Sequence, residues 1–209
     1  RKRLTGATAT EVSAIDPGRT RFIGSCRATN TVASLEQVMA EVAPADTVLV
    51  LRPGTASSRD SEVKRRLIDD PASVQLLGVA FSQPPADWYD EWRDLLGADP
   101  DAAAVVTTPD LAETDLGDRD LDVESVTTPS NLTGVGVKST PYLSEWSDAV
   151  VVVESLTVLL QYADPQILYR FLHVLTTRLQ TVDAAGQFFL DPNLLDDQTV
   201  ELLKTLFDA

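Results

Sequence analysis

The sequence predicts an α/β domain of three layers, in which helices cover both faces of a mostly parallel sheet. Short apolar runs, typical of buried strands, alternate with segments whose apolar residues recur at helical spacing. The connections between them are short, and such alternation is typical of parallel sheets covered by helices. The 209 residues, 44% of them hydrophobic, are enough to build the core of one domain of this kind.

Five apolar runs are predicted to be strands, and the most apolar of them is expected to be central in the sheet. They are residues 47–51, 74–81, 102–108, 149–153 and 187–190, with 149–153 as the central strand. Residues 109–122 are acidic and contain only isolated apolar residues, so they are expected to form a surface loop.

Capping residues and apolar spacing mark the helices between these strands. Pro84-Pro85 opens a helix that carries two tryptophans on one stripe and ends at Gly97. Thr140 and Pro141 are expected to be the N-cap and first residue of a short helix. Further helices are expected to begin at Ser34, Asp60, Asp164 and Asp197.

The acidic composition limits the partners of the chain. Seventeen basic and 32 acidic residues give a net charge of −15, so nucleic acid phosphates would repel most of the protein. The acids are mostly Asp and the bases mostly Arg, which is typical of proteins adapted to molar salt. There the Debye length is about 3 Å and self-repulsion is screened. An ordinary acidic protein is the alternative.

The N-terminal segment has the opposite charge. Residues 1–30 hold six bases and two acids, which gives +4, and the remainder holds 11 bases and 30 acids, which gives −19. Such a segment can bind nucleic acid or an acidic partner, or it can fold back onto the acidic body. We favour the second, because no aromatic residues interleave with the bases. We therefore expect a basic N-terminal extension (residues 1–30) and a single domain (residues 31–209).

Several classes of function are disfavoured by the composition. The single cysteine, Cys26, cannot form an internal disulfide, and with the single histidine, His173, it cannot make a four-ligand zinc site. No apolar run is long enough to cross a bilayer, and no signal-peptide pattern opens the sequence. We expect a cytoplasmic location and no membrane contact.

The loop after the first strand stands where a phosphate-binding loop belongs. Such a loop needs glycines whose N–H groups cradle phosphate, a Lys for the phosphate charge and a Ser or Thr for Mg²⁺. Residues 51–58 follow the outline G-P-P-G-T-G-K-T, in which Gly54, Thr55 and Ser58 match. Three essential residues of the pattern are replaced: Leu51 stands at the position of the first Gly, Ala56 at that of the second Gly, and Ser57 at that of the Lys. The pattern predicts a degenerate site, and a plain loop is the alternative.

Residues 150–157 resemble a Walker B strand of the form h-h-h-h-D-S-L-[ST], and residues 77–87 are similar to the second strand of KaiC-type proteins. Longer strings resemble an uncharacterised haloarchaeal family of KaiC-like proteins that lacks a working P-loop, in the RecA superfamily. They are residues 131–137, 155–162, 170–176, 190–192, 196–200 and 206–209. The last of them resembles the start of a further family strand, which would mean that the domain is truncated at its C-terminus.

The resemblance implies a RecA/KaiC-like core over residues 46–209 with a degenerate Walker A loop. It places Glu154 at the Walker B position and Ser155 after it, with Gln83 and Asp191 on the same rim at the carboxyl ends of the strands. No catalytic base can be assigned, and no firm metal site. Glu154 and Ser58 are weak candidates for Mg²⁺, since a Glu carboxylate is displaced outward from the position of an Asp.

Together these features predict a non-catalytic RecA/KaiC-like regulatory or scaffolding domain without a cofactor, which acts on a protein partner or as a homo-oligomer. Two alternatives stay open. In the first, the domain is a nucleotide-binding sensor or weak ATPase that uses ATP and Mg²⁺, with Gly54, Thr55 and Ser58 on phosphate and Glu154 on the metal. In the second, it is a DNA-linked regulator that uses residues 1–30.

Overall fold

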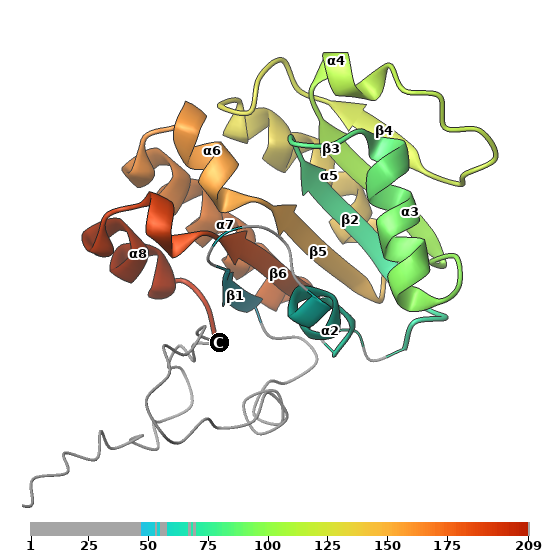
Figure 1. Cartoon of the computed structure of the whole chain (residues 1–209), viewed down its shortest axis with the longest axis horizontal. Helices are drawn as coiled ribbons and strands as arrows, with labels where there is room; N and C mark the ends of the chain where they lie inside the picture. The colour runs from blue at the N-terminus through green and yellow to red at the C-terminus, as the bar shows by residue number, and fades with distance from the viewer. Residues whose placement is uncertain (1–46, 53, 55–57, 67, 69, 209) are drawn as a thin grey trace, which may run out of the picture.

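Within the described residues, one sheet of six parallel strands forms the centre of the domain (Figure 1). The computed structural model describes residues 47–208 except 53, 55–57, 67 and 69. The strands are β1 (Thr47–Leu51), β2 (Gln75–Ala80), β3 (Ala102–Thr107), β4 (Asp122–Ser125), β5 (Ala149–Glu154) and β6 (Ala185–Leu190). Their order in the sheet is β1-β6-β5-β2-β3-β4, and all neighbouring strands are parallel.

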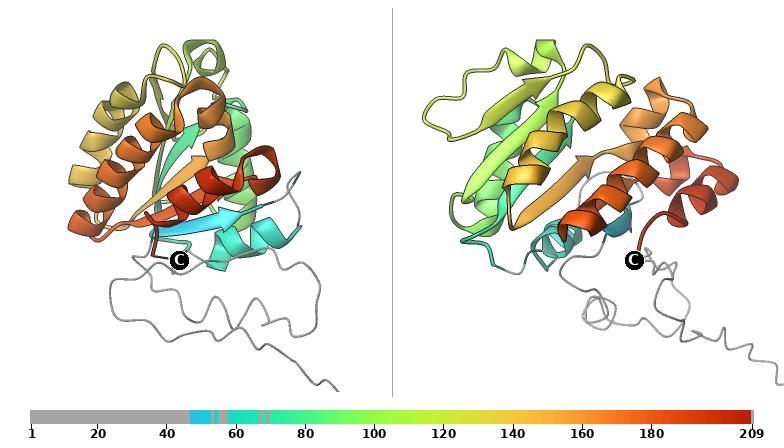
Figure 2. Two further views of the ribbon diagram at one scale, coloured as in Figure 1. Left: turned by 90° about the vertical axis from the view of Figure 1, so that its left-hand side faces the viewer. Right: turned by 180° about the vertical axis from the view of Figure 1, so that it is seen from behind.

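Helices cover both faces of this sheet, which confirms the predicted three-layer α/β fold. One face carries α2 (Ser58–Arg66) and α3 (Pro85–Leu96). The other carries α5 (Leu132–Glu145), α6 (Leu156–Tyr162), α7 (Pro165–Val182) and α8 (Asp197–Lys204) (Figure 2). The short helix α4 (Pro109–Ala112) lies near β4, and a 3₁₀ turn, η1 (Pro192–Leu194), precedes α8.

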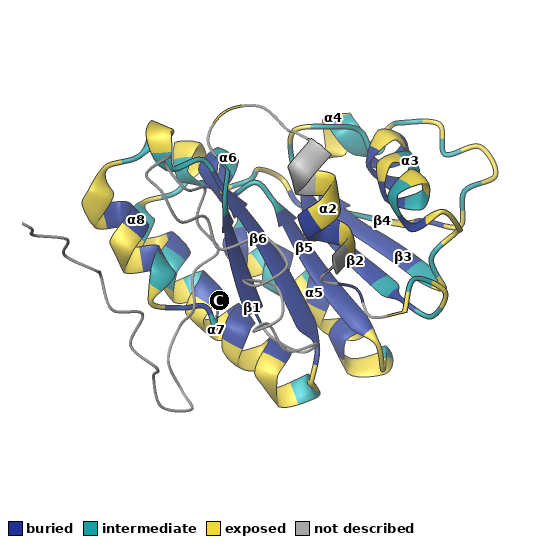
Figure 3. Cartoon of the chain, turned by 60° about the horizontal axis from the view of Figure 1, so that its bottom comes forward, coloured by how far each residue is buried: buried dark blue, intermediate teal, exposed yellow. Residues whose placement is uncertain are grey.

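Each face of the sheet has its own hydrophobic core. Along β5, Val151 and Val153 pack under α5, α6 and α7, whereas Val150 and Val152 pack under α2 and α3. The strand is therefore apolar from Ala149 to Val153, as expected for a strand covered on both faces. Figure 3 shows the buried strands between helices that are exposed on their outer sides. The predicted central place of residues 149–153 is confirmed, since β5 lies between β6 and β2.

The five predicted strands are present, with ends shifted by two residues or fewer, but the surface loop expected over residues 109–122 covers only 113–121 of that segment. That segment contains α4 and leads into β4, which pairs with β3. The four residues of β4 are half-buried or exposed, and only Val123 is apolar. Backbone pairing with β3 holds this edge strand, and such pairing leaves no hydrophobic pattern in the sequence.

The short helix expected to begin at Thr140 is also wrong, because one helix runs from Leu132 to Glu145 and contains Pro141. Asn131 caps it by accepting a hydrogen bond from the Gly134 N–H at 2.9 Å. A proline inside a helix removes one hydrogen bond and costs about 3 kcal/mol. Burial of apolar side chains on both sides of the proline, among them Val135 and Leu143, offsets that cost.

A close approach between β2 and α3 fixes the distance of α3 from the sheet. Trp88 is fully buried and lies directly over Gly78 of β2. A Cβ atom at Gly78 would stand 2.5 Å from Cζ2 of the Trp88 ring, which is closer than real side chains approach. Glycine is therefore required at this position for packing, although its backbone is ordinary strand.

We predict that Gly78→Ala lowers the free energy of unfolding by about 1–3 kcal/mol, the usual cost of overpacking a well-filled core. Chemical denaturation followed by circular dichroism would measure it. Gly136→Ala is the matched control, because its Cβ would meet only Phe171 at 3.8 Å inside helix α5. The control should be neutral or stabilising, since Ala is the better helix former. Equal effects of the two substitutions would contradict the prediction.

Candidate functional site

The carboxyl ends of β2 and β5 define the candidate site. All strands are parallel, so their carboxyl ends share one edge of the sheet. From there β2 continues into α3 on one face, whereas β5 continues into α6 on the other. The two strands are neighbours, with Ala80 beside Glu154. In open α/β sheets, ligands bind at such a reversal of strand order.

The structure brings several of the sequence-predicted residues to this edge. Glu154 is the last residue of β5, a cis peptide bond joins it to Ser155, and Ser155 precedes α6. Gln83 follows β2, and Asp191 follows β6. From the phosphate-loop segment, Gly54 is described and Ser58 is the first residue of α2, two residues before the expected start. Thr55 and Ser57 lie outside the described residues.

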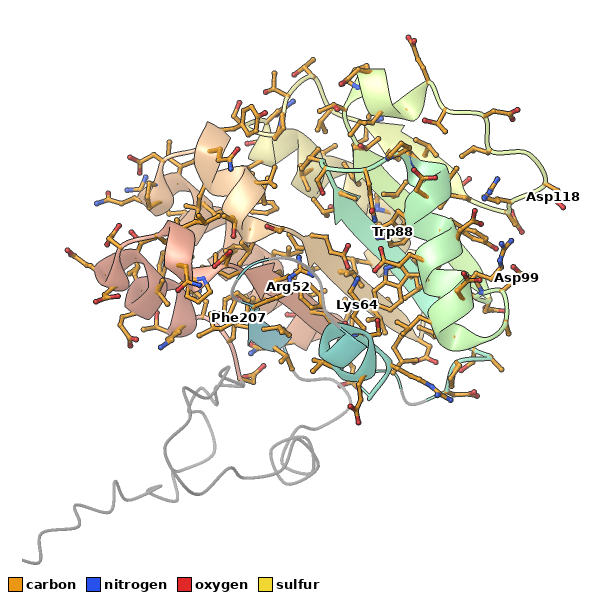
Figure 4. The ribbon with its side chains drawn as sticks, in the orientation of Figure 1. Arg52, Lys64, Trp88, Asp99, Asp118 and Phe207 are labelled. Carbon is orange, nitrogen blue, oxygen red and sulfur yellow. The ribbon has the colours of Figure 1, made fainter. Side chains whose placement is uncertain are left out.

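A buried lysine that the sequence analysis did not single out occupies the centre of the site. Lys64 of α2 is buried, and its side chain is only 4% exposed. Its Nζ atom contacts Oε1 of Glu154 and lies 2.7 Å from Oε1 of Glu91 of α3. Figure 4 shows the Lys64 side chain between α2, α3 and the sheet. One ammonium thus joins a carboxylate of α3 to a carboxylate of β5.

The surroundings of the Lys64 ammonium exclude water and favour its charge. Nζ lies 5.2 Å from the ring centroid of Trp92 and 5.3 Å from that of Phe189, within the range of cation–π attraction. The backbone oxygen of Lys64 accepts a hydrogen bond from Gln187 at 3.1 Å. The residue is therefore fixed at both its backbone and its side chain.

The two carboxylates respond differently to this environment. Burial raises the pKa of Glu154, and the Lys64 ammonium, which acts in the opposite direction, does not offset it. Burial also acts on Glu91, but there the ammonium and the amide of Gln83 outweigh it, so the pKa of Glu91 lies below its ordinary value. The difference follows from exposure, since the Glu154 side chain is 12% exposed and that of Glu91 is 45% exposed.

A second internal contact involves the phosphate-loop segment. Gly54 has a φ of +80°, and its N–H donates a hydrogen bond of 2.9 Å to Oδ2 of Asp191. Oδ1 of the same carboxylate accepts from the N–H of Asn193, and the N–H of Asp191 donates to the Thr157 hydroxyl. A loop amide that would face phosphate in a working site therefore faces a carboxylate.

These contacts do not fit a magnesium nucleotide. A divalent cation at Glu154 would need its carboxylate oxygen, and the Lys64 ammonium contacts that oxygen. Phosphate needs free loop N–H groups, and Asp191 holds that of Gly54 and adds a like charge. Within the part of the chain that the structure describes, no group of three or more His, Cys, Asp or Glu side chains could hold a metal ion.

Lys64 and Glu91 were missed because the sequence shows neither the burial of Lys64 nor its contact with Glu91. Lys64 stands in the run Lys64-Arg65-Arg66, which is typical of a solvated helix face, and charged residues are rarely buried. Glu91 lies in a helix rich in acids. One signal in the sequence was available. Val63 is the only apolar residue in the sequence of α2, so the side of the helix near Val63 is the side expected to face the sheet, and Lys64 is next to it and is buried as well.

One known family matches the chain: residues 45–209 match the model of a family of unknown function (DUF7504), and the chain belongs to it. No curated protein matches the sequence. In the described ranges, no helix is long and apolar enough to cross a membrane. Residues 1–30 lie outside the described ranges, so their division from the domain and their contact with DNA stay predictions.

We predict that Lys64→Met lowers the free energy of unfolding by about 3–5 kcal/mol at neutral pH, because it leaves Glu154 buried without its partner. The loss should be small at low pH and grow as the pH rises from about 4.5, the ordinary pKa of this carboxyl. Without the ammonium, folded Glu154 keeps its proton to higher pH than the unfolded chain does, so stability falls through that interval. Urea denaturation at several pH values would measure it.

Two controls accompany this prediction. Lys64→Met combined with Glu154→Gln removes both charges and should recover most of the loss. Lys138→Met breaks the surface ion pair with Glu124, whose side chains are 44% and 32% exposed, and should cost at most about 1 kcal/mol at any pH. A Lys64→Met effect as small as that of Lys138→Met would show that the buried pair is not an anchor.

Proposed function

We propose that this member of the DUF7504 family is a non-catalytic RecA/KaiC-like regulatory or scaffolding domain of a salt-adapted cytoplasm, which acts through protein contacts. The contact between the Lys64 ammonium and the Glu154 carboxylate carries the proposal. It places a positive side chain of the protein where an active relative would hold a metal ion.

The position of Glu154 in the fold supports the relationship to RecA/KaiC-like proteins. The Walker B-like strand β5 and the strand β1, which leads into the degenerate loop, are separated only by β6. Their carboxyl ends therefore lie at the same edge, where a nucleotide would have to reach both. The resemblance of residues 150–157 to a Walker B strand points to the same ancestry.

The energetics favour an internal ion pair over a bound metal. Mg²⁺ at Glu154 would have to displace Lys64 and leave a buried ammonium without its partner. Breaking a buried pair in this way costs about 3–5 kcal/mol, which corresponds to two to four decades of affinity. Displacement of Asp191 from the Gly54 N–H adds to that cost. These two costs together would reduce the affinity for Mg²⁺ and nucleotide below the range typical of nucleotide-binding proteins.

A domain of this fold that binds no nucleotide can still function by binding other proteins. The described surface carries a large excess of acids, and five large hydrophobic side chains outside the candidate site are more than half exposed: Val137, Tyr162, Ile167, Val174 and Leu194. Exposed apolar side chains that cluster mark interaction surfaces. We therefore expect the domain to bind through its helical layer and not through the former nucleotide edge.

The test is calorimetric titration of ATP with Mg²⁺ into the protein at about 2 M KCl, where charge repulsion is screened. We expect no binding up to millimolar ATP. The double variant Lys64→Met/Glu154→Gln should behave in the same way, because it keeps the site closed to metal without leaving a buried charge. Circular dichroism would confirm that both proteins are folded.

Micromolar binding by the unaltered protein would overturn the proposal. If Ser58→Ala or the double variant abolished that binding, the domain would be a nucleotide sensor or weak ATPase with an altered phosphate loop. Asp191→Asn is the matched variant for the loop, because it removes the charge that faces the Gly54 N–H and keeps the shape of the side chain. It should raise ATP affinity only if phosphate binds there.

A further inference from the structure

An apolar groove lies between α5 and α7 on the outer side of the helical layer. Its volume is about 500 Å³, and Leu132, Leu143 and Phe171 form part of its lining. Three more apolar side chains on its walls are exposed to solvent: Val137 by 65%, Ile167 by 54% and Val174 by 69%. A groove between two helices that exposes such side chains is suited to a helix with an apolar face.

The charges at the groove are positive, in contrast to the net charge of −15. Arg170 and Arg178 of α7 line it and are the charged residues of its lining. They are eight residues apart, which places them about 12 Å apart along the helix axis. The Arg178 guanidinium donates a hydrogen bond to the Ser144 hydroxyl of α5 at 2.9 Å, so it is held across the groove. The groove therefore favours a helix that carries carboxylates beside its apolar residues.

The segment formed by η1 and α8 presents such a surface. Leu194 is 66% exposed and Leu202 is 37% exposed. Asp197 and Glu201 are also exposed and lie between the two leucines. Asp197, Glu201 and Leu202 lie on the half of α8 that faces away from the buried Val200 and Leu203, and Leu194 precedes the helix at the end of η1. Among the described residues, Tyr162 is the one exposed large hydrophobic side chain outside the groove and this face.

We propose that the η1–α8 face of one copy binds the α5–α7 groove of a second copy. Leu194 and Leu202 would fill the groove between Val137, Ile167 and Val174. Asp197 and Glu201 would face the two arginines, with Glu201 exchanging its 2.6 Å ion pair to Lys204 of its own helix for an arginine of the second copy. The α8 face cannot reach the groove of its own chain, because α7 lies between α8 and α5 (Figure 2). Both surfaces belong to the same helical layer, so two facing copies can exchange the contact and close a two-fold dimer.

This inference deepens the proposed function, because it names a second copy of the chain as the protein partner. It rests on the proposed scaffolding role. The two are tested separately. Self-association is measured without nucleotide, and nucleotide binding is measured by calorimetry at a site on the edge of the sheet. A dimer that binds ATP would overturn only the proposed function, and a monomer that binds none would overturn only this inference.

The experiment is sedimentation velocity on the full chain over a concentration series up to several hundred micromolar. Potassium chloride at about 1 M keeps the net charge from holding the copies apart. We expect a concentration-dependent dimer for the unaltered protein. Val174→Asp in the groove and Leu202→Asp on α8 should each raise the dissociation constant at least tenfold. Tyr162→Asp, an exposed apolar residue outside both surfaces, is the matched control and should leave it unchanged.

Mixing the two variants tests which surfaces meet. Val174→Asp keeps an intact α8 face and Leu202→Asp keeps an intact groove, so a mixture can form one good contact and should dimerise more tightly than either variant alone. A monomer at all concentrations, a dimer that neither substitution weakens, or a mixture that restores nothing would each overturn the proposal. A dimer weakened by Val174→Asp but not by Leu202→Asp would also overturn it and would indicate a groove-to-groove contact instead. Circular dichroism of each variant shows that it is folded.

Discussion

The position of α2 depends on one buried ammonium. In the sequence of this helix Val63 is the only apolar residue, so burial of hydrophobic surface can contribute little to holding it on the sheet. Lys64 replaces that contribution with polar contacts to Glu91 of α3, Glu154 of β5 and Gln187 of β6. A buried ion pair seldom adds much to stability, but it permits few arrangements, since each charge must meet its partner. The pair thus specifies where α2 lies, and with it where the loop after β1 ends.

Much of the fold follows from patterns in the sequence, and the candidate site follows only in part. Strands buried on both faces leave continuous apolar runs, which is why the position of β5 could be predicted. An edge strand such as β4 leaves no such run, and a proline such as Pro141 indicates a helix start that long-range packing overrides. Local signals fail where contacts from distant parts of the chain decide the outcome.

The same reasoning explains the site. Gln83, Glu154, Ser155 and Asp191 could be placed on one edge because parallel strands bring their carboxyl ends together. The partner of Glu154 could not be predicted, because a lysine in a run of basic residues looks like part of a solvated face. Only the packing of α2 and α3 turns the Lys64 side chain inward, between the rings of Trp92 and Phe189.

The replacements at this edge are complementary in charge. Where a nucleotide site would offer N–H groups to phosphate, Asp191 supplies the negative oxygen, and where it would hold a divalent cation, Lys64 supplies the positive nitrogen. In the ancestry that we propose, loss of the nucleotide would leave these opposed groups without neutralisation unless side chains of the domain took over both charges. These two residues do so from different elements, α2 and the segment after β6. With both charges paired inside the protein, the proposed function needs no ligand at this edge and assigns binding to the outer helical layer.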